Sequence, residues 1–171
     1  VTDMSGMFKN ATQFNNGGSE GIDEWDVSNV ETMKSMFEGA TDFNQGVNPG
    51  WDVGKVENMS GMFKDAANFN KKVNAWNVEK VEDMSGMFNG ASKFNQPLHN
   101  WDVENVNHMG SMFKNAPNFN QDISNWDVSK VKNMTKMFAI ENADKPGSFN
   151  QNLSHWGSNT FDGNVVYTGI F

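Results

Sequence analysis

The sequence of 171 residues contains no cysteine, no arginine, one tyrosine and four prolines. Without cysteine the chain can form no disulfide, thiolate metal site or thiol nucleophile. All positive charges are lysines, 13 in number, and 21 acidic residues bring the net charge to −8. An acidic chain without arginine suits phosphate groups poorly. We therefore expect it to bind neither nucleic acid nor an anionic membrane surface.

Long apolar runs are also missing. No stretch of about 18 apolar residues occurs, so we expect no membrane insertion in this segment, and no signal peptide is visible. The chain starts at Val1, in the middle of a repeat. We therefore expect it to be processed, or excised from something longer.

What the sequence does contain is one unit repeated along the whole chain. Trp76, Trp101 and Trp126 are each 25 residues apart, and all 12 methionines fall in two columns of the repeat. A period of this length lies in the range of leucine-rich-repeat-like arrays, in which each unit packs on its neighbours. The tryptophans that mark the copies are Trp25, Trp51, Trp76, Trp101, Trp126 and Trp156.

Within each unit the apolar spacing changes once. Trp101 and Val103 are two residues apart, as on one face of a strand. From Val106 onward, apolar residues recur every three or four positions, as on one face of a helix. The sequence therefore predicts an α/β solenoid, a leucine-rich-repeat-like right-handed array of strand–short helix units of about 25 residues. We assign residues 1–156 to about six units and residues 157–171 to a degenerate last half-unit or cap.

Two polar columns predict turns. The residue before the helical alanine tolerates left-handed backbone in five copies, which predicts the C-terminal cap of each helix: Asn10, Gly39, Asp65, Gly90 and Asn115. The second column is asparagine in every copy. An inward asparagine can bond two backbone groups of its own turn and one of the next. We predict a structural ladder there, with a row of ligand-binding amides as the alternative: Asn15, Asn44, Asn70, Asn95, Asn120 and Asn150.

The residue after each tryptophan is the main candidate for chemistry. A row of carboxylates could hold calcium. Alternatively, each side chain could cap backbone N–H groups as an Asx turn. Asn77 stands in this column and favours capping, because an amide keeps the hydrogen bond and loses the charge. We predict no metal and no other cofactor; the metal candidates would be Asp26, Asp52, Asp102 and Asp127.

The remaining reactive or aromatic residue types also have a structural explanation. We predict the tryptophans and methionines as core; the alternatives are sugar stacking for tryptophan and soft-metal binding for methionine. The three histidines form no metal-spaced cluster, and no nucleophile motif accompanies the serines. We therefore expect no catalytic residue and no enzyme. Glycosylation stays open at four sequons, Asn10, Asn58, Asn133 and Asn152.

The stretch 119–129, followed by Val131-x-x-Met134-x-x-Met137-Phe138, resembles a known repeat. It is similar to the repeats of mycoplasma-type surface lipoproteins, relatives of the BspA-like leucine-rich-repeat surface proteins. The resemblance extends to about Trp156, while residues 157–171 and Asn77 depart from it. It implies a surface-exposed or secreted protein that makes adhesive or matrix contacts, with no catalytic residues to carry over.

We therefore predict a non-enzymatic repeat protein, extracellular or on the cell surface, that mediates adhesion or contact with a protein or glycan. The alternative is a structural subunit that stacks end to end into a fibre or surface layer. Both ends present the same half-unit, and head-to-tail contacts that do not close generate filaments. The sequence names neither ligand nor organism. The predicted end contacts are Met4, Met7 and Phe8 at one end and Tyr167, Ile170 and Phe171 at the other.

Overall fold

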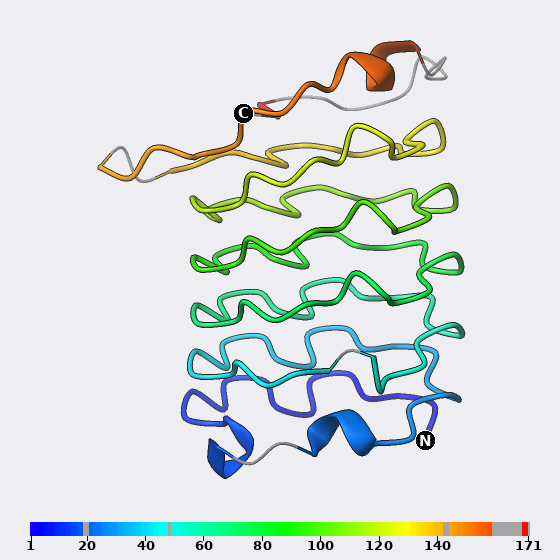
Figure 1. The fold of residues 1–171 in the computed structure, drawn as a ribbon, viewed down its shortest axis with the longest axis vertical. Helices are drawn as coiled ribbons and strands as arrows, with labels where there is room; N and C mark the ends of the chain where they lie inside the picture. Colours follow the sequence, from blue (N-terminus) through cyan, green and yellow to red (C-terminus); the bar gives the residue numbers. More distant parts are fainter. Residues whose placement is uncertain (19–20, 48, 142–143, 159–168, 171) are drawn as a thin grey trace.

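The computed structural model describes residues 1–18, 21–47, 49–141, 144–158 and 169–170. Each repeat makes one flattened coil, and the coils lie one above another along the long axis (Figure 1). We number them by residues: coil 1 is 1–21, coil 2 is 22–46, coil 3 is 47–72, coil 4 is 73–97, coil 5 is 98–122, coil 6 is 123–152, and coil 7 begins at 153. Neighbouring coils run parallel, joined by isolated bridges through Asp3, Thr32, Asn58, Asp83, His108 and Asn133.

The predicted α/β solenoid is wrong. Across the described ranges there is no α-helix and no extended strand. Regular structure there consists of single bridges and three short 3₁₀ helices: η1 (Asn16–Gly18), η2 (Ile22–Glu24) and η3 (Ser154–Ser158). The leucine-rich-repeat-like, right-handed array of strand–helix units is therefore not the fold of this chain.

The predicted helix does not form because residues in its middle have left-handed backbone. Gly86 has φ of 61° and Ser111 has φ of 58°, whereas an α-helix needs negative φ throughout. Gly90 and Asn115, the predicted helix caps, are also left-handed, at φ of 72° and 54°. The column was thus correctly predicted to be left-handed, but it belongs to a turn and not to a helix end.

Consecutive turns produce the spacing that resembles a helix. In coil 5 the N–H of Met112 donates to the carbonyl of Met109, and the N–H of Ala116 donates to that of Phe113. Met112 and Ala116 are thus each bonded to the apolar residue three positions earlier. The same bond joins Trp101 to Leu98. A strand does not form at the Trp-x-Val step because the chain there turns instead of extending.

Backbone hydrogen bonds between coils replace those within a helix. From coil 4, Met84, Gly86 and Phe88 donate their N–H groups to carbonyls of coil 5 at 2.9 Å. Alternate residues bond within the coil and to the next coil. This satisfies the backbone of a thin, tightly wound segment without a sheet.

The core runs the length of the stack. Aromatic rings form columns, with Phe88 and Phe94 of one coil 3.9 Å apart and Phe88 and Phe113 of successive coils 5.7 Å apart between ring centroids. The methionines of coils 2 to 6 are buried beside them. Because every coil contributes the same side chains, each coil is packed against two like neighbours.

Extra residues lengthen the repeat in three places, at 16–20, 49–50 and 142–147. Gly17 and Gly18 are exposed, as are Pro49 and Gly50. Residues 144–147 are exposed in a segment that projects beyond the edge of the stack near its upper end (Figure 1).

Candidate interaction surface

The tryptophans lie in the core and each joins two coils. Trp51, Trp76 and Trp101 are only 2 to 3% exposed. The indole Nε1 of Trp101 donates to the carbonyl of Val73 in the preceding coil, at 3.0 Å. The rings of Trp51 and Trp76 stack on each other at 6.3 Å, so their faces are not open to a sugar. Trp126 and Trp156 are also buried, and Trp25 is half-buried.

The asparagine column links the coils in series. The Oδ1 of Asn95 accepts the backbone N–H of Asn120 at 3.0 Å, and the Oδ1 of Asn70 accepts that of Asn95. Gln121 adds its Nε2 to the same Oδ1 of Asn95, at 2.9 Å. Asn15, Asn44 and Asn120 accept in the same way, and Asn150 donates at the end of the described series. In five of the six asparagines the Oδ1 is thus bonded to the next coil.

The aspartates after the tryptophans form Asx turns. The Oδ1 of Asp26 accepts both the N–H and the hydroxyl of Ser28, at 3.1 and 2.6 Å. These two bonds hold the pKa of Asp26 below its ordinary value. Asn77 makes the same turn with the N–H of Glu79. Asp52, Asp102 and Asp127 repeat it, and in the described residues no three acidic or histidine side chains are grouped as a metal site.

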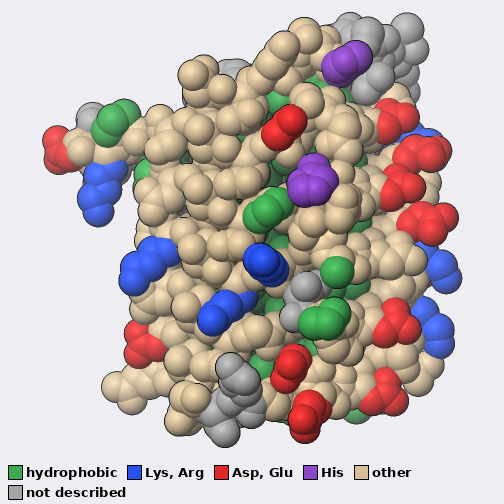
Figure 2. Space-filling view, viewed as in Figure 1, with side chains coloured by type: hydrophobic (Ala, Val, Ile, Leu, Met, Phe, Trp, Pro, Cys, Tyr) green, Lys and Arg blue, Asp and Glu red, His purple; other side chains and the backbone are tan. Residues whose placement is uncertain are grey.

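These turns belong to a strongly charged strip that we call the charged edge: residues 26–31, 52–57, 77–82, 102–107 and 127–132. It carries nine carboxylates and four lysines, a net −5 of the chain's −8. Acidic and lysine side chains gather along the right-hand edge of the stack in Figure 2. The outward residues of these turns do not pack in the core, so they can differ from coil to coil without changing it.

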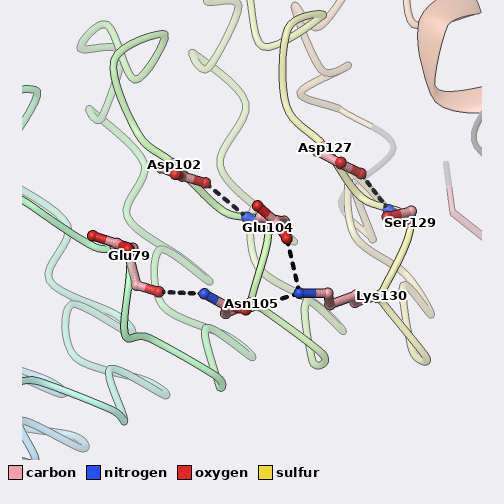
Figure 3. A network of polar contacts seen from close by, with 7 residues as sticks. All are labelled: Glu79, Asp102, Glu104, Asn105, Asp127, Ser129 and Lys130. Carbon is pink, nitrogen blue, oxygen red and sulfur yellow. Dashed lines mark hydrogen bonds and ion pairs between the residues drawn. The ribbon is translucent and has the colours of Figure 1, made fainter.

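Side chains of the charged edge reach from coil to coil (Figure 3). The Nδ2 of Asn105 donates to the carbonyl of Glu79 at 2.9 Å, and the Nζ of Lys130 donates to the Oδ1 of Asn105 at 3.0 Å. Lys130 also pairs with Glu104 at 2.9 Å, but both side chains are half-exposed. Such an exposed pair contributes about 0.2–1 kcal/mol. The charged edge is therefore a solvent-exposed surface on which a few side chains are fixed by hydrogen bonds between coils.

A further polar column was not predicted. It holds the bridge residues Asn58, Asp83 and Asn133, whose Oδ1 atoms accept the N–H of the residue two positions on. The Ser or Thr at that second position is the sequence signal that would have found it. His108 interrupts the column. Two residues after it stands Gly110, where a side chain would have little room because the amide of Asn133 lies close by.

Two of the four sequon asparagines, Asn58 and Asn133, belong to this column, and the other two, Asn10 and Asn152, are exposed.

The predicted end contacts fall partly within the described residues. Met4 is buried, Met7 is 46% exposed, and Phe8 is half-buried against Phe14. Ile170 is half-buried, and its carbonyl accepts the N–H of Phe138. Tyr167 and Phe171 lie outside the described residues.

A hollow among the described residues lies on the edge opposite the charged one. It has a volume of about 600 Å³ and is lined by residues of coils 4, 5 and 6, Lys145 among them. The charged edge carries a smaller depression between Glu57, Glu79 and Glu82.

No helix in the described part of the chain is long and apolar enough to cross a bilayer.

Stacked coils with a uniform core and a changing outer surface define a non-globular repeat protein. The chain belongs to the family described as "Mycoplasma protein of unknown function, DUF285", whose family model matches residues 1–95 and again residues 70–165. Comparison with curated proteins gives no significant match, and neither does comparison with solved structures.

Proposed function

We propose that the chain is a non-enzymatic protein of the cell surface or extracellular space that acts by contact with a protein or glycan. One observation carries this proposal: inward columns are uniform while outward columns change from coil to coil. The inward position at Met109 is methionine in coils 2 to 6. The outward position two residues before it reads Glu31, Glu57, Glu82, Asn107 and Lys132.

A uniform interior holds the shape, and a varied exterior provides contacts that differ along the stack. A rigid scaffold with variable surface residues is how many binding proteins are organised. The resemblance to mycoplasma-type and BspA-like surface proteins supports the location outside the cell. The net charge of −8 and the absence of arginine favour a ligand other than nucleic acid.

Binding of the purified chain to immobilised matrix proteins and to a glycan array tests this function. We expect saturable binding to at least one of them, and weaker binding when Glu79 and Glu104 are both replaced by lysine, if the charged edge takes part. Antibody labelling of intact producing cells tests the location. Binding to none of the probes, or labelling only after the cells are permeabilised, would contradict the proposal.

End-to-end assembly is a second candidate, because the first coil presents apolar side chains. Met7 is 46% exposed, and Phe8 and Phe14 are only partly buried. A second copy stacked there would cover them and generate a fibre if the contact does not close. Sedimentation of the chain at rising concentration tests this: growing assemblies that Met7→Lys abolishes support it, and a concentration-independent monomer contradicts it.

A further inference from the structure

Three described residues of coil 6 form one wall of the hollow opposite the charged edge. Gly90 and Ser92 of coil 4 and Asn115 and Pro117 of coil 5 form its floor. Ile140, Glu141 and Lys145 stand beside them in coil 6. At about 600 Å³ the hollow has the size of a ligand pocket. We call it the insertion hollow.

Ile140 is out of place in its column, which otherwise holds residues that tolerate left-handed backbone: Asn10, Gly39, Asp65, Gly90 and Asn115. A β-branched residue is disfavoured there, and the chain leaves the regular path at this point. The N–H of Glu141 bonds to the Oδ1 of Asn115, at 2.9 Å. Ile140 remains half-exposed, so an aliphatic side chain faces the hollow together with the ring of Pro117.

The charge around the hollow differs in sign from that of the chain. Glu141 is held by Lys114 at 2.8 Å and by Lys136 at 3.3 Å, and these lysines keep its pKa lowered. Lys145 lines the hollow, is exposed, and makes no ion pair with any described residue. The two acidic residues Glu141 and Asp144 and the three lysines Lys114, Lys136 and Lys145 together carry one net positive charge, whereas the whole chain carries −8.

Hydrogen-bond donors of the hollow also remain available. The Oδ1 of Asn115 is occupied by Glu141, and its Nδ2 has no hydrogen-bond partner among the described residues. The Nζ of Lys145 is the second donor. Two donors beside an aliphatic pair suit a carboxylate next to an apolar group. The described residues that line the hollow include no aromatic ring, which is the usual platform for a sugar.

We propose that the insertion hollow binds an extended acidic peptide segment of a partner protein. An aliphatic side chain of the peptide lies between Ile140 and Pro117, and a carboxylate binds Lys145 and the amide of Asn115. This inference rests on the proposed contact function and names the chemistry of one partner.

A fluorescein-labelled eight-residue peptide of alternating leucine and glutamate tests the proposal by fluorescence anisotropy. We expect saturable binding at concentrations below about 1 mM, and at least tenfold weaker binding for the same peptide with the neutral glutamine in place of glutamate. Lys145→Glu and Ile140→Asn, the latter matching the residue of coils 1 and 5, should each weaken binding roughly tenfold or more. Lys71→Glu makes the same charge change at an exposed lysine outside the hollow and should leave binding unchanged.

A third variant removes the whole wall. Replacing residues 139–148 with the five residues 114–118 of coil 5 restores the regular period and should abolish peptide binding. Circular dichroism and sedimentation show whether this variant keeps the wild-type fold, and the two point variants decide the matter if it does not.

Equal loss in the Lys71→Glu and Lys145→Glu variants would overturn the inference, because binding would then follow net charge alone. Equal binding of both peptides, no binding of either, or binding of a sialylated oligosaccharide in place of the acidic peptide would overturn it as well. The contact function itself fails only if the wild-type chain binds none of the matrix proteins and glycans, so the two failures are distinct.

Discussion

The indole nitrogen of Trp101 and the carbonyl oxygen of Val73 are joined by a hydrogen bond of 3.0 Å across two successive coils. The same carbonyl also accepts the N–H of Trp76 in its own coil. One aliphatic residue per repeat thus closes its own turn and holds the next coil through a tryptophan.

This bond and the packing of the ring can be separated by two substitutions. Trp101→Phe removes the Nε1 donor, and because Val73 keeps its bond from Trp76 we expect a loss of only about 1 kcal/mol beyond the smaller ring volume. Trp101→Ala also empties the core and should cost about 3–5 kcal/mol. Urea unfolding followed by fluorescence measures both. Equal costs for the two variants would show that ring packing contributes little.

The asparagine ladder predicts a large effect from a small side chain. Asn95→Ala leaves the N–H of Asn120 without its acceptor and the Nε2 of Gln121 with only the backbone carbonyl of Asn95, and should cost about 1–3 kcal/mol of unfolding free energy. Asn118 of coil 5 is exposed, and Asn118→Ala should change stability by less than about 0.5 kcal/mol. Similar values for the two variants would contradict the ladder.

Gly90 and Asp65 should be energetically coupled. Gly90 has φ of 72°, and a Cβ at Gly90 would overlap the Oδ1 of Asp65 in the preceding coil. Gly90→Ala therefore suffers a left-handed backbone cost of about 1–2 kcal/mol and an additional steric cost. In an Asp65→Gly background only the backbone cost remains. A double-mutant cycle measures the difference, and additive effects would place Asp65 away from Gly90.

We expect Glu38 to make the free energy of unfolding depend on pH in the acid range. It bonds Lys9 at 2.9 Å and Lys64 at 3.1 Å, linking coils 1, 2 and 3. Burial raises its pKa, but bonds from Ser35, Lys9 and Lys64 outweigh this and lower it from 4.5 to about 2. Because the pKa of Glu38 is lower in the folded than in the unfolded chain, its ionised form stabilises the fold at pH values above the unfolded-state pKa.

This contribution should be present above about pH 4.5 and lost as the pH falls toward about 2. Glu38→Gln should therefore be less stable than the wild type at pH 7, by on the order of 2 kcal/mol, and the gap should close by pH 2. Urea titrations at several pH values measure it. A gap that stays constant between pH 7 and pH 2 would contradict the ion pairs.

The period, the inward columns and the left-handed column could all be predicted from the sequence, whereas the local structure could not. Met109, Met112 and Phe113 have the spacing of a helix, because a chain of turns also returns a side chain to the same side after three residues. The distinguishing signal was glycine in the middle of the corresponding segment of coils 3 and 4, at Gly61 and Gly86. Each glycine is about 1 kcal/mol worse than alanine in a helix.

The surface was less predictable than the core. The bond from Lys130 to Asn105 depends on how one coil is offset from the next, which no spacing within a single repeat encodes. The insertion hollow depends on where residues 144–147 lie relative to two earlier coils. Ile140 was visible in the sequence as a departure from its column, but its partner Pro117 was not.

The central claim is that each repeat is a coil of turns bonded to its neighbours, with no helix in the methionine segment. Scalar couplings across hydrogen bonds, measured by NMR, test it most directly. We expect a coupling from the amide nitrogen of Gly86 to the carbonyl carbon of Gly110, together with a positive φ at Ser111. A coupling from Gly86 to the carbonyl carbon of Glu82, the pattern of an α-helix, with a negative φ at Ser111, would contradict it.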